Sequence, residues 1–165
     1  MAAEGLECVV IHPNDQFLGE STLSENEKSL VLMCRFGHFK ILLTGDIQEH
    51  SLRRLVEDYG EALRADVLLL PHHGESVPGL REFVELVRPG IALASCDSEP
   101  GQVRLLLDDM GVPLWTTAEH GAVVMEVRTD EISVSGFRSG RHKRLDLAAG
   151  GADDSPRASV GAMDR

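Results

Sequence analysis

Two apolar stretches of this chain end at residues that can hold a metal ion. LLTGD places Asp46 directly after the first stretch, and LLLPHHG places His72 and His73 directly after the second. Carboxylate oxygen and imidazole nitrogen are preferred ligands of zinc, and they also suit manganese or iron. The pattern therefore raises the possibility of one catalytic metal site built from both stretches.

Hydrophobic patterning predicts the elements that would position these residues. Apolar runs favour strands at 39–44 and 67–70, and the helical spacing of apolar residues between them predicts a helix over 47–59. The other expected elements are a strand at 7–12, a strand at 29–35 that forms a hairpin with 39–44, helices over 78–88 and 102–110, strands at 91–94 and 113–116, and a closing hairpin of 121–127 and 131–137. This alternation predicts an α/β domain over 1–137 with a partly parallel, mixed sheet and flanking helices.

A strand, a crossover helix and a parallel strand return the chain to the same edge of a sheet. If the two strands are close neighbours, Asp46 and the histidines lie roughly 5–10 Å apart at the carboxyl ends, where open α/β sheets bind ligands. Simpler interpretations also stand. Asp46 can be the N-cap of the following helix, and His72-His73 can be an ordinary loop feature.

Charge and composition narrow the function classes. The formal net charge is −11, and residues 1–137 carry 10 Lys and Arg against 23 Asp and Glu, so tight non-specific nucleic-acid binding is not expected. The three cysteines are isolated, which favours reduced thiols in a cytoplasmic protein. Neither a membrane span nor a secretory signal is predicted.

The segment 138–165 is rich in Gly, Ala, Ser and charge, and it is predicted to be a disordered tail. A basic cluster at its start could contact nucleic acid or anionic lipid, or it could simply be solvated; its members are Arg138, Arg141, Lys143 and Arg144. His120, next to Gly121, is interpreted as a solvated turn residue.

Three motifs together resemble the metallo-β-lactamase-type domain of the bacterial DNA-internalisation competence protein (ComEC) family. They are NEKSLVL at 26–32, LLTGD at 42–46 and ADVLLLPHHG at 65–74, and GVPLWTT with GAVVMEV is similar to the closing segment of that domain. The resemblance implies a metallo-β-lactamase-like αββα sandwich, two zinc or manganese ions, and nuclease-like hydrolysis of DNA linked to DNA uptake. It assigns the bridging ligand to Asp46 and the last histidine ligand to His72 or His73.

The chain lacks the H-x-H-x-D-H motif that supplies the other ligands in that superfamily. Its remaining histidines match no such spacing; they are His12, His38, His50, His120 and His142. The chain therefore resembles the C-terminal half of the domain. We expect it to be inactive alone, with the missing N-terminal half or a membrane competence protein as its partner and DNA as a possible ligand.

Two other interpretations remain open. The chain could be a degenerate, non-catalytic module of the same fold that serves in binding or structural pairing. It could also be an unrelated α/β domain in which Asp46, His72 and His73 are caps and core residues. If the chain is half of a layered domain, one sheet face lacks a cover, and an exposed apolar patch is expected.

Overall fold

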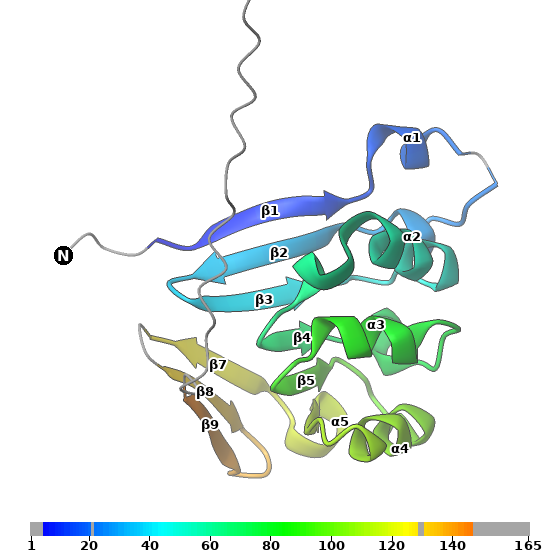
Figure 1. Cartoon of the computed structure of the whole chain (residues 1–165). Helices are drawn as coiled ribbons and strands as arrows, with labels where there is room; N and C mark the ends of the chain where they lie inside the picture. The colour runs from blue at the N-terminus through cyan, green and yellow to red at the C-terminus, as the bar shows by residue number, and fades with distance from the viewer. Residues whose placement is uncertain (1–4, 21, 129–130, 147–165) are drawn as a thin grey trace, which may run out of the picture.

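The apolar runs form two β-sheets with helices along one side of the larger sheet (Figure 1). The computed structural model describes residues 5–20, 22–128 and 131–146. The first sheet has six strands in the spatial order β1 (Glu7–His12), β2 (Val31–Phe36), β3 (Phe39–Leu43), β4 (Val67–Leu69), β5 (Ile91–Ala94) and β6 (Leu114–Thr116). The chain is thus an α/β protein with a mixed sheet and flanking helices, as predicted.

The connections between consecutive strands explain why the sheet contains both antiparallel and parallel pairs. Strands β1, β2 and β3 follow one another through short or polar connections and pair antiparallel. From β3 to β6, each connection contains a helix, and each pair is parallel. Leu43 at the end of β3 is level with Leu69 at the end of β4, so the residues that follow these strands leave the sheet at the same edge.

The helices bury their apolar stripes on one face of the first sheet (Figure 1). The hydrophobic core on this face includes Leu52, Leu55, Phe83 and Leu107, all nearly inaccessible to solvent. The helical elements are α1 (Asp15–Leu18), η1 (Asn26–Lys28), α2 (Glu49–Tyr59), η2 (Gly60–Leu63), η3 (His72–Gly74), α3 (Leu80–Val87), α4 (Gly101–Asp109) and α5 (Thr117–His120). The three long helices agree with the predicted ones to within two residues at either end.

A second, three-stranded sheet packs against the opposite face through a core that contains Trp115, Ile132 and Val134. Its antiparallel strands are β7 (Val123–Val127), β8 (Glu131–Gly136) and β9 (His142–Asp146). Strand β9 corrects the predicted disordered tail, because residues 138–146 form a turn and a strand paired with β8. Leu145 packs into the core between the sheets, and this burial favours the ordered strand. The remainder of the predicted tail lies outside the described residues.

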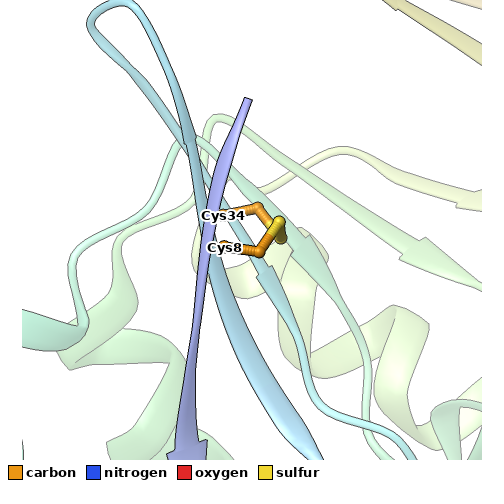
Figure 2. The surroundings of a disulfide bond; sticks show 2 residues. All are labelled: Cys8 and Cys34. Atoms are coloured by element: carbon orange, nitrogen blue, oxygen red, sulfur yellow. A yellow bond between two sulfur atoms is a disulfide. The ribbon is translucent and has the colours of Figure 1, made fainter. Parts of the chain in front are cut away.

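Cys8 and Cys34 form a disulfide between β1 and β2 (Figure 2). The expectation of three reduced thiols is therefore wrong for this pair, and among the cysteines Cys96 is free. The reason is the strand register, which places Cys8 directly opposite Cys34 although 26 positions separate them in sequence. Disulfides persist mainly in oxidising compartments, so the cysteines no longer favour a cytoplasmic location.

Exposed apolar side chains gather at the free edge of the first sheet. Leu6, Val9 and Val10 on and beside the outer strand β1 are more than half exposed.

Within the part of the chain that the structure describes, no helix has the length and apolar character needed to cross a bilayer.

Candidate functional site

The turns after β3 and β4 meet at the carboxyl edge of the sheet. The chain bends at Gly45, where φ is +57°. A Cβ atom there would lie 3.0 Å from Ser29 Cβ and 3.1 Å from the Leu30 carbonyl oxygen, so this close approach favours glycine. The Gly45 carbonyl accepts a hydrogen bond from the His72 backbone N–H at 3.1 Å. This bond holds the loop carrying Asp46 beside the loop carrying both histidines.

Asp46 and His73 face each other across this junction. Asp46 Oδ1 lies 3.5 Å from His73 Nε2, and both side chains are substantially exposed. The other ring nitrogen, Nδ1, lies 2.9 Å from the Ser95 carbonyl oxygen. Because a carbonyl can only accept, Nδ1 carries the proton and Nε2 of a neutral ring presents its lone pair to Asp46. Two acceptors then face each other, an arrangement that a cation or a proton between them would stabilise.

His72 has different partners. Its Nε2 lies 3.4 Å from the Asn26 amide nitrogen, and its Nδ1 lies 3.4 Å from the Gln48 amide nitrogen. Glu75 Oε2 is 3.2 Å from the same Nδ1. The ring is thus enclosed by polar groups, whereas the Nε2 of His73 faces a carboxylate. The structure brings Asp46 together with His73. It places His72 in contact with Asn26, Gln48 and Glu75 instead.

The backbone at the two histidines is strained. His72 and His73 have φ values of +47° and +58°, in the left-handed region that few residues other than glycine adopt. Gly74 continues the run at +85°. Non-glycine residues in this region cost free energy and are concentrated at functional sites. The residue whose ring faces Asp46 thus has a backbone conformation that costs local stability.

The start of helix α2 is capped by Glu27, a residue that no local sequence pattern indicates. Glu27 is buried, and its carboxylate accepts hydrogen bonds from the backbone N–H groups of His50 at 3.0 Å and Ser51 at 2.9 Å, with Gln48 at 3.3 Å. Burial on its own would raise the pKa of Glu27, but the bonds from Ser51, His50 and Gln48 outweigh it and lower that pKa. The N-cap interpretation of Asp46 is therefore wrong, because Glu27 fills that role.

A cleft of about 780 Å³ opens next to His73. It lies between the loop after β4 and the loop after β5, with the start of α4 as its far wall. The carboxyl ends of parallel strands commonly carry binding sites in open α/β sheets. His73 thus lines this cleft and connects it to Asp46, which lies outside the lining.

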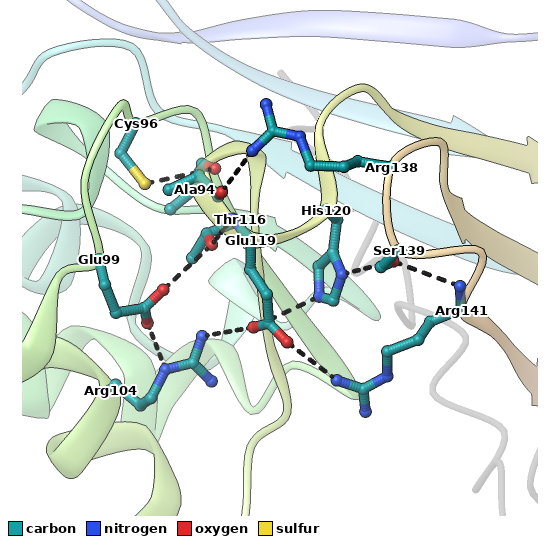
Figure 3. Close-up of polar contacts among 11 residues, drawn as sticks. Ala94, Cys96, Glu99, Arg104, Thr116, Glu119, His120, Arg138, Ser139 and Arg141 are labelled. Atoms are coloured by element: carbon teal, nitrogen blue, oxygen red, sulfur yellow. Dashed lines mark hydrogen bonds and ion pairs between the residues drawn. The ribbon is translucent and has the colours of Figure 1, made fainter.

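His120 is fully buried, which corrects its interpretation as a solvated turn residue (Figure 3). The centroid of its ring lies 4.4 Å from that of Trp115, with the two planes tilted by 38°, and Nδ1 lies 2.8 Å from Ser139 Oγ. Neighbouring Glu119 pairs with Arg104 and with Arg141, each at 3.2 Å. Composition does not indicate this burial, because Ser139 belongs to the segment predicted as a tail. Figure 3 shows Ser139 beside the His120 ring and Arg141 extended toward Glu119.

The basic cluster is partly engaged by the fold. Arg138 donates a hydrogen bond to the Ala118 carbonyl at 3.0 Å, and Arg144 lies 3.7 Å from Glu131.

Among residues 5–20, 22–128 and 131–146, no group of three or more His, Cys, Asp or Glu side chains is arranged to hold a metal ion. The described chain therefore offers two converging candidate ligands, Asp46 and His73.

Comparison with known proteins gives three partial likenesses. Competence protein ComA of Neisseria gonorrhoeae is 32% identical over 92 residues, covering 56% of this chain and 13% of that protein. ComE operon protein 3 of Bacillus subtilis is 32% identical over 72 residues, covering 44% of this chain and 9% of that protein. The uncharacterized protein YcaI of Escherichia coli is 33% identical over 70 residues, 42% of this chain and 9% of that protein.

The chain spans 13% or less of the length of these curated relatives. No protein-family model matches it. Of these three relatives, ComA carries a name that states a role in competence.

Proposed function

We propose that this chain supplies one half of a metal-dependent hydrolytic centre that cleaves DNA phosphodiesters during DNA uptake, and that it is inactive alone. The observation that carries the proposal is the Asp46–His73 pair, in which the Ser95 carbonyl fixes the imidazole proton on Nδ1. Histidines that bind metals commonly donate their other ring N–H to a carbonyl or carboxylate in this way.

The donor set suits zinc or manganese in part. Asp46 Oδ1 and His73 Nε2 would hold the ion, and the bound metal would lower the pKa of a water molecule and stabilise negative charge in the transition state. Catalytic zinc sites have three protein ligands, and this pair supplies two. The remaining ligands would come from a partner, either the missing N-terminal half of the domain or a membrane competence protein.

The surrounding residues of this chain have positioning roles in the proposal. Ser95 orients the His73 ring through its backbone carbonyl. Asn26 and Gln48 enclose His72, whose backbone N–H bonds the Gly45 carbonyl of the turn that carries Asp46. The motif at 26–32 thereby supports both loops of the site, since Ser29 also packs against Gly45.

A second candidate function is a non-catalytic binding or pairing module. It is favoured because the described residues contain no group of three candidate metal ligands, and Asp46 and His73 supply two. Metal binding separates the candidates, because a module that has lost its catalytic role has no reason to retain ion affinity at Asp46 and His73.

The test is zinc and manganese content after equilibrium dialysis of the purified chain and its Asp46→Ala, His73→Ala and His72→Ala variants. We expect up to one ion per chain in the wild type, loss in the first two variants and retention in the third. Hydrolysis of a single-stranded DNA oligonucleotide by the isolated chain should stay at the level of buffer. Equal metal content in the wild type and Asp46→Ala would refute the proposed site.

A further inference from the structure

The cleft beside His73 has an unusual lining for a protein expected to act on DNA. Its polar walls carry the hydroxyls of Ser76, Ser95 and Ser98 and the amide of Gln102. Two carboxylates, Glu75 and Asp97, also line it, and among the described residues no Lys or Arg lines this cleft. Nucleic-acid grooves that track phosphates are normally basic. This cleft is therefore unsuited to phosphate.

The dimensions and chemistry suit an uncharged, hydrogen-bonding ligand. Small-molecule sites typically have volumes of about 300–1,000 Å³, and this cleft falls within that range at about 780 Å³. Hydroxyl and amide side chains can both donate and accept, so they match the hydroxyls of a sugar and the polar edge of a base. Ser98, Gln102 and Asp97 are exposed and accessible to such a ligand. Glu75 is also exposed, and its carboxylate lies 3.2 Å from His72 Nδ1.

We infer that the cleft is a subsite for a nucleoside moiety and disfavours phosphate groups. The inference rests on the proposed function for the placement of the subsite beside a reacting phosphodiester at Asp46 and His73. In that arrangement the sugar and base next to the cleaved bond lie against Ser98 and Gln102. The carboxylates of Glu75 and Asp97 disfavour a phosphate within the cleft, and the charged group would lie outside it, on the Asp46 side of His73.

Backbone amide NMR titration of the metal-free chain with thymidine and with thymidine 5′-phosphate tests this subsite. Thymidine should shift the amides of Ser98, Gly101 and Gln102. The phosphate should bind about tenfold more weakly, because its charge is brought near two carboxylates. The Glu75→Gln/Asp97→Asn double variant, which changes two exposed side chains, should bring the two ligands to similar affinities.

The matched control is Glu82→Gln on α3, an exposed carboxylate outside the cleft, and it should leave the preference unchanged. Absence of thymidine shifts at millimolar concentration would overturn the subsite, and so would tighter binding of thymidine 5′-phosphate to the wild type. Metal is omitted from this titration, so its failure leaves the metal content of the Asp46 and His73 variants as an independent measure of the proposed function.

Discussion

Glu27 and Asp46 both lie near the start of helix α2, and their surroundings are opposite. Glu27 is 5% exposed and accepts hydrogen bonds from backbone N–H groups of three residues of the helix start. The Asp46 side chain is 43% exposed and faces the Nε2 atom of His73. A carboxylate whose hydrogen bonds are all made within the protein, such as that of Glu27, stabilises the fold. Within the described part of the chain, the carboxylate of Asp46 has no such set of bonds, so its oxygens are open to a ligand.

The largest expected effect is the loss of stability on Glu27→Ala. The substitution leaves three buried or half-buried N–H groups at the start of α2 without their charged acceptor, and we expect a destabilisation of about 3 kcal/mol. Urea denaturation followed by circular dichroism measures it. Glu27→Gln, which keeps an acceptor without the charge, should fall between alanine and the wild type. A loss no larger than that of Asp46→Ala would remove the contrast between the two carboxylates.

Acid should lower stability through Glu27 and its buried neighbour His12, whose Nε2 atom lies 2.8 Å from the Glu27 carbonyl oxygen. Burial lowers the pKa of His12 below its usual 6.5, so the unfolded chain takes up that proton first and stability falls as the pH drops below about 6.5. The pKa of Glu27 is lowered from 4.5, so its contribution is present above that value and is lost as the pH falls through the folded pKa.

Denaturation at pH 7, 5.5, 4.5 and 3 measures both windows. Glu27→Gln should reduce the loss between pH 4.5 and 3, while the loss between pH 7 and 5.5 persists. The same steep loss below pH 4.5 in the variant and the wild type would show that other carboxylates control acid unfolding.

Relief of backbone strain at His73 should increase stability, by less than the loss expected for Glu27→Ala. Glycine adopts a φ of +58° without the steric cost that a Cβ atom incurs. His73→Gly should therefore be more stable than His73→Ala by about 1 kcal/mol. Both variants lack the imidazole, so their difference isolates the backbone. Equal melting temperatures for the two variants would contradict stored strain at this position.

The smallest expected effect is that of Asp46→Ala. The side chain is half-exposed and its contact with His73 is long, so stability should change by less than about 0.5 kcal/mol. The variant should lose metal content despite its stability. A destabilisation above about 2 kcal/mol would instead make Asp46 a structural residue.

Local patterns predict much of this fold from the sequence. Periodicity places the β3–α2–β4 unit, because apolar residues at helical spacing separate two short apolar runs, and it places the hairpin of β2 and β3. The meeting of Asp46 with the His72-His73 loop follows from that topology. Strand topology does not determine which histidine faces Asp46. That depends on the Ser95 carbonyl and on two positive φ values, which no residue pattern in PHHG specifies.

The errors have a common physical origin in long-range contacts. Cys8 and Cys34 bond because of strand register, and His120 is buried by residues of a polar segment that composition assigns to a tail. Glu27 caps a helix that begins more than twenty residues later in the chain. Each of these contacts joins positions whose relation becomes visible when the sheets are assembled.

The central claim is that Asp46 and the Nε2 atom of His73 form one half of a metal site. Zinc titration of ¹⁵N-labelled protein, followed through the histidine ring nitrogens by NMR, tests it most directly. The account predicts a shift of His73 Nε2 with Nδ1 still protonated, a weaker response at His72, and loss of the His73 shift in Asp46→Ala. A response centred on another histidine, or one that persists unchanged in Asp46→Ala, would contradict the account.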